Sequence, residues 1–222
     1  MALALIERFE EGRRWTQRYD LDVPPQSTVL DLLFEIQQQL DETLSFRYSC
    51  RNWMCGSCGM LVNGRERLAC RTRLAELAAD TVHISPLRNL PVLKDLIVDL
   101  APFFEKWNAV GVAFPETSGR TSSVSANTQH EIDTHSDCIT CGLCYSACDV
   151  ISHSKSFLGP AALNRAYTLQ LDTQDAAHVT RSSAIVSDDG VFRCHSMGQC
   201  TLVCPKGLDP LAAISALKRR GG

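Results

Sequence analysis

The chain opens with stretches of hydrophobic and polar residues that are typical of β-strands. Residues 2–10 and 15–23 carry two such stretches around a turn at Glu11-Gly12. Pro24-Pro25 then breaks the pattern, because proline cannot donate to a strand ladder. The pattern therefore predicts two strands joined by a short turn.

Apolar positions recur at helical spacing in the next stretch, which predicts an amphipathic helix running to about Leu40. Ser27 or Thr28 can cap its first turn, because a hydroxyl oxygen accepts a hydrogen bond from a free backbone N–H group. The apolar stripe of this helix comprises Val29, Leu32, Leu33, Ile36 and Leu40.

A second group of strands is expected between residues 60 and 84. Met60–Val62 reads as a strand, and the Asn63-Gly64 pair after it is a strong hairpin signal. A short segment then leads to Cys70, and Thr81–Ile84 reads as a closing strand. A helix is expected over about Leu93–Trp107. Its apolar side comprises Leu96, Leu100, Phe103, Phe104 and Trp107.

The pattern changes after residue 108. Residues 109–136 are rich in Ser, Thr, Gly and Asn, which predicts an interdomain linker with little regular structure. Helical signals follow: Pro160 at the start of one helix, and Asp209 as N-cap of the last. The fold class is therefore α+β, with an α+β domain over residues 1–108, the linker, and a mostly helical domain over residues 137–222.

Composition excludes several classes of protein. The formal net charge is −3 and the charges are mixed, so nothing indicates a nucleic-acid partner. No stretch approaches the roughly 20 apolar residues of a membrane span. The best candidate, Leu96–Phe104, contains Asp99 and Pro102. The basic tail, Lys218, Arg219 and Arg220, suits the negative end of a helix dipole, and contact with lipid phosphates is the alternative.

The eleven cysteines carry the candidate chemistry. An odd number in tight C-x2-C spacing, without an export signal, favours metal binding over disulfides. The first set has the spacing C-x4-C-x2-C with a distant fourth cysteine, as in plant-type [2Fe–2S] proteins. A zinc site is the alternative, but zinc usually takes two separated cysteine pairs. The set comprises Cys50, Cys55, Cys58 and Cys70.

The remaining seven cysteines form one complete and one incomplete bacterial ferredoxin motif. In two-cluster ferredoxins the fourth cysteine of each motif binds the cluster of the other. Cross-ligation gives a [4Fe–4S] cluster to Cys138, Cys141, Cys144 and Cys204. It leaves Cys148, Cys194 and Cys200 for the third cluster. Met197 stands where a fourth cysteine would fall, so three ligands predict a [3Fe–4S] cluster. Since cluster charge affects potential, we expect Met197 to select a higher-potential centre.

These residues resemble the iron–sulfur subunit of succinate dehydrogenase and fumarate reductase, respiratory complex II. The matching stretches include FRYSCRNWMCGSCGMLVNG, PLRNLPVLKDLIVD, CITCGLCYSAC, DDGVFRCHSMGQC and CPKGLDP. The resemblance implies a β-grasp [2Fe–2S] domain followed by an all-α helical ferredoxin domain. It implies a relay from FAD in a flavoprotein subunit through [2Fe–2S], [4Fe–4S] and [3Fe–4S] to quinone. No dicarboxylate chemistry and no catalytic residue is expected on this chain.

The resemblance also implies partners and a location. The partners are the flavoprotein and a membrane anchor that can carry cytochrome b, and the chain is expected to be peripheral on the cytoplasmic face of the inner or plasma membrane. His195 and Lys206 match residues that the family places near quinone, beside Met197. His195 could instead hydrogen-bond to the backbone, and Lys206 could balance cluster charge.

The segment DVISHSKSFLGP departs from many ubiquinone-linked members. They have proline after the cysteine equivalent to Cys148 and then a tryptophan pair, and this chain has neither. The departure favours menaquinone. Succinate dehydrogenase is the preferred activity, because FRCHS and CPKGLDP look more like that branch. CGLCYSAC resembles fumarate reductases, which is the alternative. A free ferredoxin-like carrier is a further alternative, which would be a soluble monomer with a strongly charged docking face.

Overall fold

The computed structural model describes residues 2–77, 79, 81–111, 123–172, 175 and 177–221. The chain forms two compact units. Unit 1 contains the residues up to Leu100 together with Ile139–Ser146, and unit 2 contains Ala101–Cys138 and the residues from Ala147 onward. The segment Ile139–Ser146 therefore joins the N-terminal unit, although the sequence placed it in the helical domain over 137–222.

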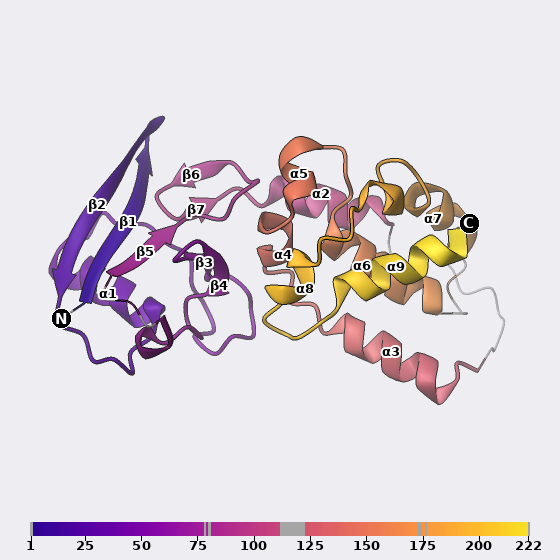
Figure 1. The fold of residues 1–222 in the computed structure, drawn as a ribbon, viewed down its shortest axis with the longest axis horizontal. Helices are drawn as coiled ribbons and strands as arrows, with labels where there is room; N and C mark the ends of the chain where they lie inside the picture. The colour runs from indigo at the N-terminus through magenta and orange to yellow at the C-terminus, as the bar shows by residue number, and fades with distance from the viewer. Residues whose placement is uncertain are drawn as a thin grey trace. The chain divides into compact units, whose positions relative to one another are not determined.

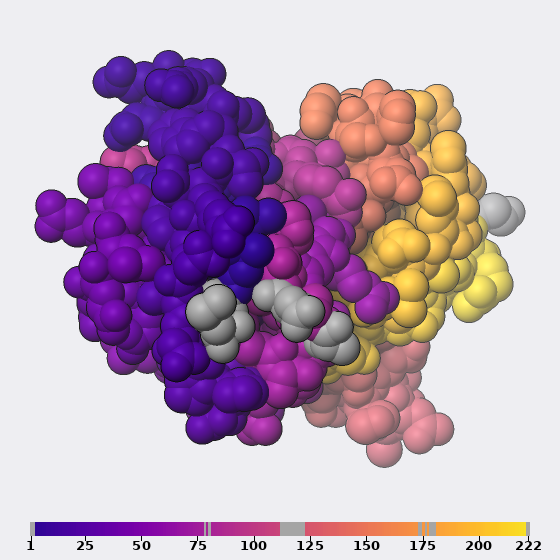
Figure 2. Space-filling model, turned by 60° about the vertical axis from the view of Figure 1, so that its left-hand side comes forward, coloured from indigo at the N-terminus to yellow at the C-terminus, as the bar shows by residue number. Residues whose placement is uncertain are grey.

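Unit 1 is built on a mixed five-stranded sheet in the order β2-β1-β5-β3-β4. The strands are β1 (Ala2–Glu10), β2 (Arg13–Leu21), β3 (Gly59–Val62), β4 (Arg65–Leu68) and β5 (Thr81–Ser85). β1 pairs parallel with β5 and antiparallel with β2. The turn between β1 and β2 extends beyond the rest of this unit, where its indigo ribbon and atoms project (Figures 1 and 2). This arrangement confirms the predicted β-grasp class.

Helix α1 (Val29–Gln39) supplies the second layer of unit 1. Thr28 caps it: its hydroxyl oxygen accepts from the Asp31 N–H at 3.1 Å, and the Asp31 carboxylate accepts from the Thr28 N–H at 2.8 Å. The predicted apolar stripe is buried as far as Ile36, whereas Leu40 is exposed. A short 3₁₀ turn (Leu74–Leu77) and helix α4 (Leu143–Ser146) complete the helical elements described in this unit.

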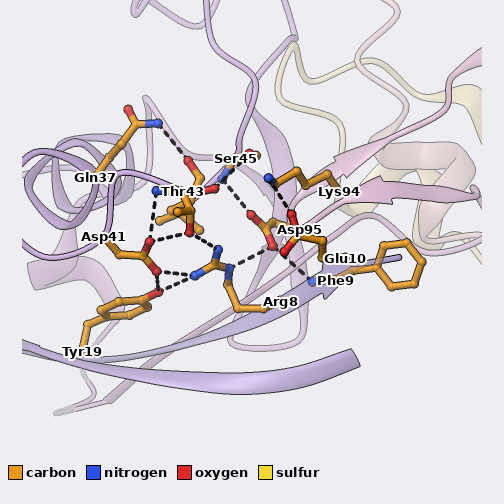
Figure 3. Close-up of polar contacts among 11 residues, drawn as sticks. Arg8, Phe9, Glu10, Tyr19, Gln37, Asp41, Thr43, Ser45, Lys94 and Asp95 are labelled. Carbon is orange, nitrogen blue, oxygen red and sulfur yellow. Dashed lines mark hydrogen bonds and ion pairs between the residues drawn. The ribbon is translucent and has the colours of Figure 1, made fainter. Parts of the chain in front are cut away.

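The predicted helix over Leu93–Trp107 is wrong in its first half. Residues Val92–Lys94 and Ile97–Val98 form the small sheet β6–β7, and helix α2 begins only at Ala101. The cause is Asp95, whose side chain is fully buried and which has a φ of +46° between the two strands. It accepts hydrogen bonds from the backbone N–H groups of Phe9 and Ser45 (Figure 3). These long-range bonds hold a turn where the local pattern favours a helix.

A buried ionic network surrounds that turn. The Arg8 guanidinium donates to Asp95 at 2.9 Å and to Tyr19 at 2.7 Å, and it also pairs with Asp41 (Figure 3). Burial and a hydrogen bond to Asp41 raise the pKa of Tyr19 to about 12. Burial alone would raise the pKa of Asp41, but hydrogen bonds from Thr43, Tyr19 and Arg8 lower it below its usual range. The network ties β1 to the loop after α1 and to β6–β7.

Unit 2 is helical in the part that the structure describes. Its helices are α2 (Ala101–Ala109), α3 (Ala126–Ser136), α5 (Asp149–His153), α6 (Pro160–Leu171), α7 (His178–Ile185), α8 (Gln199–Leu202) and α9 (Pro210–Gly221), with a 3₁₀ turn η2 at Val191–Arg193. The starts of α6 and α9 confirm the expectations from Pro160 and Asp209. The Asp209 carboxylate accepts from the Ala212 N–H at 3.0 Å, as an N-cap does.

Helix α3 corrects the expectation of little regular structure over residues 109–136. Ser125, in a serine-rich stretch read as a loop, is its N-cap and accepts from the Thr128 N–H at 3.1 Å. At the other end, buried His135 is 2.6 Å from the amide oxygen of Asn164 on α6. Tertiary contacts therefore support a helix of low intrinsic propensity. Residues 112–122 of the predicted linker lie outside the described residues, and a linker role for the whole segment stays a prediction.

Candidate metal centres

The loop around Cys50–Cys58 is curled so that its backbone N–H groups surround cysteine sulfur atoms. Asn52, Met54 and Cys55 donate to the Cys50 Sγ atom at 3.3–3.4 Å. Trp53 donates to the Cys70 Sγ atom at 3.3 Å, which brings the distant fourth cysteine to the loop. Arg51, Trp53 and Gly56 have φ values of +55°, +46° and +74°, which turn the chain around the sulfurs. These turns let the backbone approach the cysteine sulfurs closely.

The thiols of the first set lie in unequal surroundings. Cys50 and Cys55 are exposed, whereas Cys58 is buried. Partial burial pushes the pKa of Cys55 upward, but hydrogen bonds with Ser57 and Cys50 outweigh it and bring the pKa to about 6. Burial raises the pKa of Cys58 to about 12. Since thiolates are the ligands of iron, the N–H donors of this loop help to stabilise the required charge.

Two arginine–aromatic stacks flank the first set. The Arg71 guanidinium lies 4.4 Å from the centre of the Trp53 ring. The Arg51 guanidinium lies 4.9 Å from the centre of the Phe34 ring and 5.6 Å from that of the Tyr48 ring. Stacking holds each cation beside the anionic ligand set while leaving it hydrated on one side.

Two cysteines of the second set belong to unit 1, because α4 is fixed there by polar contacts. The Ser146 hydroxyl donates to the Glu66 carboxylate at 3.0 Å and accepts from the Arg88 N–H at 2.9 Å. The Arg88 guanidinium donates to the same carboxylate oxygen at 2.7 Å. Cys141 and Cys144 lie on this anchored segment, whereas Cys138 and Cys204 belong to unit 2.

The three cysteines of the third set line one cavity in unit 2. Its lining includes Cys148, Cys194 and Cys200, together with the predicted neighbours His195 and Met197. Burial, with neighbouring Cys194 and Cys148 adding to it, raises the pKa of Cys200 to about 11. Burial and the nearby Cys194 also raise the pKa of Cys148. The structure thus brings together the three residues that the spacing grouped, in a largely apolar setting.

The residues expected near quinone differ in their placement. His195 and Met197 lie at the surface where they line the cavity, and Met197 is 58% exposed. Lys206 is half-buried and is not among the lining residues of this cavity. Two of the three residues expected near quinone, His195 and Met197, therefore line this cavity.

Sequence reasoning missed Lys218, which it assigned to the helix dipole. Helix α9 packs against η2, and the Lys218 ammonium donates to the Cys194 carbonyl oxygen at 2.7 Å. The Cys194 sulfur also accepts from the Ser196 N–H at 3.4 Å. Only the packing of α9 reveals this role, because 24 residues separate the two partners.

The ligand types fit the predicted clusters. Soft thiolates are the donors that iron–sulfur clusters use, and none of the eleven cysteines forms a disulfide. The first set offers N–H donors to sulfur, and the three cysteines of the third set line one cavity together with Met197. Both arrangements are therefore suited to clusters held by cysteine.

Comparison with known families supports this interpretation. The 2Fe-2S iron-sulfur cluster binding domain matches residues 4–105, and the 4Fe-4S dicluster domain matches residues 134–208. The protein is thus of the class that joins a [2Fe–2S] domain to a domain for two further clusters.

Individual proteins with similar sequences or structures identify the family within this class. A fumarate reductase iron-sulfur subunit of Mycobacterium tuberculosis is 39% identical, over 91% of this chain and 84% of the relative. A succinate dehydrogenase iron-sulfur subunit of Paracoccus denitrificans is 37% identical, over 86% of this chain and 74% of the relative. A structure of the Mycobacterium smegmatis Sdh1 complex in the apo form contains a chain with a TM-score of 0.91 and 26% identity, covering 99% of this chain and 95% of that one.

The chain therefore belongs to the family of iron–sulfur subunits of succinate dehydrogenases and fumarate reductases. Members of this family are subunits of oxidoreductase complexes and transfer electrons through iron–sulfur clusters. The described residues contain no helix that is long and apolar enough to cross a membrane.

Proposed function

We propose that this chain is the electron-relay subunit of a succinate dehydrogenase, taking single electrons from the FAD of a flavoprotein subunit and delivering them to quinone at a membrane anchor. The observation that carries the proposal is the cavity of the third set. It gathers Cys148, Cys194 and Cys200 beside Met197, so three cysteines converge where a [4Fe–4S] cluster would need four. A centre of this kind suits the end of a relay.

The proposed ligands follow the cysteine spacing. The first set holds [2Fe–2S], and Cys138, Cys141, Cys144 and Cys204 hold [4Fe–4S]. Cys148, Cys194 and Cys200 hold [3Fe–4S]. When bound, each cluster supplies reversible one-electron chemistry. The protein contributes N–H donors at Cys50 and Cys70, and a fixed ammonium at Cys194. These groups adjust the potentials of the two ends differently.

Quinone is proposed to approach the third set. His195 and Met197 are exposed beside the cavity, so both are accessible to a ligand that arrives with the anchor subunit. Lys206 is proposed to contribute charge nearby. The residues after Cys148 are Asp149 and Val150, which line the same cavity and replace the proline expected of many ubiquinone-linked members. We therefore favour menaquinone as the acceptor. Binding to the anchor would make this chain peripheral at the cytoplasmic face of the membrane.

Purification of the intact complex in mild detergent tests the proposal. We expect this chain to co-purify with a flavoprotein and a membrane anchor, with menaquinone as the bound quinone. The oxidised complex should show the EPR signal of a [3Fe–4S] cluster. A monomeric chain in the extract, or an oxidised sample without that signal, would refute the proposal. Ubiquinone as the sole quinone would refute the menaquinone assignment alone.

Fumarate reduction is the second candidate, because two fumarate reductase iron-sulfur subunits match this chain at 39% and 37% identity. Direction depends on potentials and on the quinone, and both activities use the same cysteine sets. Rates of succinate oxidation and fumarate reduction, measured on one preparation with the native quinone, decide between them. A faster fumarate reduction would replace succinate dehydrogenase as the physiological activity.

A further inference from the structure

The loop of the first cysteine set contacts the segment that carries Cys141, and both belong to unit 1. The contact lies at Gly56. A Cβ atom built on Gly56 would be 2.7 Å from the Cβ atom and 2.9 Å from the Cα atom of Cys141. It would also be 3.0 Å from the carbonyl oxygen of Ile139. These neighbours are backbone atoms or are bonded directly to the backbone, so they cannot rotate away.

Gly59 makes a second, looser contact with the same segment. Its Cβ atom would be 3.1 Å from the carbonyl oxygen of Cys141 and 3.1 Å from the Leu143 side chain. Gly56 follows Cys55 in the chain and Gly59 follows Cys58. Each glycine is therefore bonded to a cysteine of the first set and touches a cysteine of the second.

The Cys141 segment cannot withdraw freely from these glycines. Its C-terminal end is anchored by Ser146, which bonds to Glu66 and to the Arg88 backbone. The Asn89 side-chain amide also donates to the Ser146 carbonyl oxygen at 3.0 Å. A side chain added at Gly56 must therefore displace the loop or the segment, because close-packed interiors transmit such strain.

We propose that Gly56 and Gly59 are positioning residues that set the distance between the first and second clusters, and that electrons cross between them at the contact of Gly56 with Cys141. The proposal rests on the ligand sets assigned under Proposed function. Its physical basis is that electron tunnelling falls exponentially with the separation of two centres. Residues without side chains give the shortest approach that the backbone allows.

Gly56→Ala in the intact complex tests the proposal, and Gly64→Ala is a matched control. Gly56 and Gly64 have φ values of +74° and +75°, so alanine suffers the same backbone strain at both. A Cβ atom at Gly64 meets nothing within 4 Å. Gly59→Ala is a graded third variant, because the neighbours of its Cβ atom need to move by only a few tenths of an ångström.

The decisive measurement is EPR power saturation of the reduced [2Fe–2S] signal with the second cluster also reduced, since relaxation enhancement depends steeply on distance. Iron and sulfide contents and the [2Fe–2S] potential are measured in parallel. We expect the enhancement to fall severalfold in Gly56→Ala, less in Gly59→Ala, and not at all in Gly64→Ala. Turnover should fall in the same order.

Unchanged enhancement in a Gly56→Ala complex with full clusters would overturn the proposal, even if its potential shifts. If Gly56→Ala fails to assemble, Gly59→Ala decides: reduced enhancement supports the proposal and wild-type enhancement overturns it. Absence of the two signals from the wild-type complex would instead refute the ligand assignment under Proposed function.

Discussion

The first and third cysteine sets offer the same ligand in different surroundings. Around the first set the backbone supplies four N–H donors to sulfur, and Arg71 and Arg51 flank the loop at the surface. Around the third set the thiols are drawn into a cavity, and burial raises the pKa of Cys200 and Cys148. One fixed cation, Lys218, reaches the Cys194 backbone there. Under the proposed ligand sets, the number of cysteines sets the cluster type, and the surroundings then tune its potential.

Met197→Cys should have the largest effect, because it completes the ligand set of the third centre. We expect the oxidised [3Fe–4S] EPR signal to disappear, a fourth iron to be incorporated, and the potential of this centre to fall. Iron analysis and redox titration followed by EPR measure these changes.

Met54→Cys provides the control in the first set. Met54 and Met197 are similarly exposed, at 56% and 58%, and each lies close in sequence to cysteines proposed to bind a cluster. The first set already has four cysteines, so an added thiol should leave its spectrum unchanged. An intact [3Fe–4S] signal in Met197→Cys would show that the position of residue 197, and not its side chain, determines the cluster type.

Asp95→Ala should destabilise unit 1 without touching a cysteine. Removing one partner of a buried ion pair typically lowers the free energy of unfolding by about 3–5 kcal/mol. Because Arg8 keeps its contact with Asp41 when Asp95 is removed, we expect a loss of about 3 kcal/mol. On heating, the [2Fe–2S] signal should therefore be lost at a lower temperature, while the [3Fe–4S] signal persists. EPR of samples frozen after stepwise heating follows both.

Asp20→Ala is the surface control for this experiment, because its pair with Arg18 is exposed. It should leave the loss temperature of both clusters close to the wild-type values. Simultaneous loss of both clusters in Asp95→Ala would mean that the two units unfold together, which would remove the distinction between the two regions.

Asp95 also shows where local patterns stop predicting this fold. Strands β1, β2, β3 and β5, the Asn63-Gly64 turn and the caps at Thr28 and Asp209 were predictable, because each depends on neighbours in sequence. The β6–β7 turn was not, since its stabilising partners Arg8 and Phe9 are more than 80 residues away.

The candidate sites divide in the same way. Cysteine spacing predicted the grouping of Cys148, Cys194 and Cys200, which the cavity brings together. No local signal revealed the Lys218 bond to the Cys194 carbonyl or the contact of Gly56 with Cys141, because both arise from packing between distant segments. The spacing therefore predicts which cysteines act as ligands, whereas the groups that contact them emerge only from the packing.

Lys218→Met should lower the potential of the third cluster moderately. In general, a unit charge about 8 Å from a redox centre, at an effective dielectric constant of about 20, contributes about 2 kcal/mol. An energy of about 2.3 kcal/mol corresponds to about 100 mV of reduction potential. Because the half-buried ammonium is partly screened by water, we expect the potential to shift by only roughly 50 mV. Redox titration of the [3Fe–4S] signal measures it. Arg219→Gln, an exposed cation on the same helix, is the control. Equal shifts in both variants would assign the effect to net charge and not to the Cys194 contact.

Arg71→Gln should have the smallest effect, on the first cluster. The Arg71 cation is stacked on the ring of Trp53, and the backbone N–H of Trp53 donates to the Cys70 sulfur. Removing the Arg71 charge should therefore lower the [2Fe–2S] potential. Arg71 is exposed, and water and salt screen exposed charges strongly, so the shift should be smaller than that of Lys218→Met and should vanish near 1 M salt, where the Debye length is about 3 Å. The Lys218 shift should persist there, because a partly buried charge is screened less. Titrations of both variants at low and high salt therefore compare the two regions directly. A shift in Arg71→Gln that survives high salt would mean that the first cluster is tuned by a desolvated cation, as the third is, and the contrast between the two sites would fail.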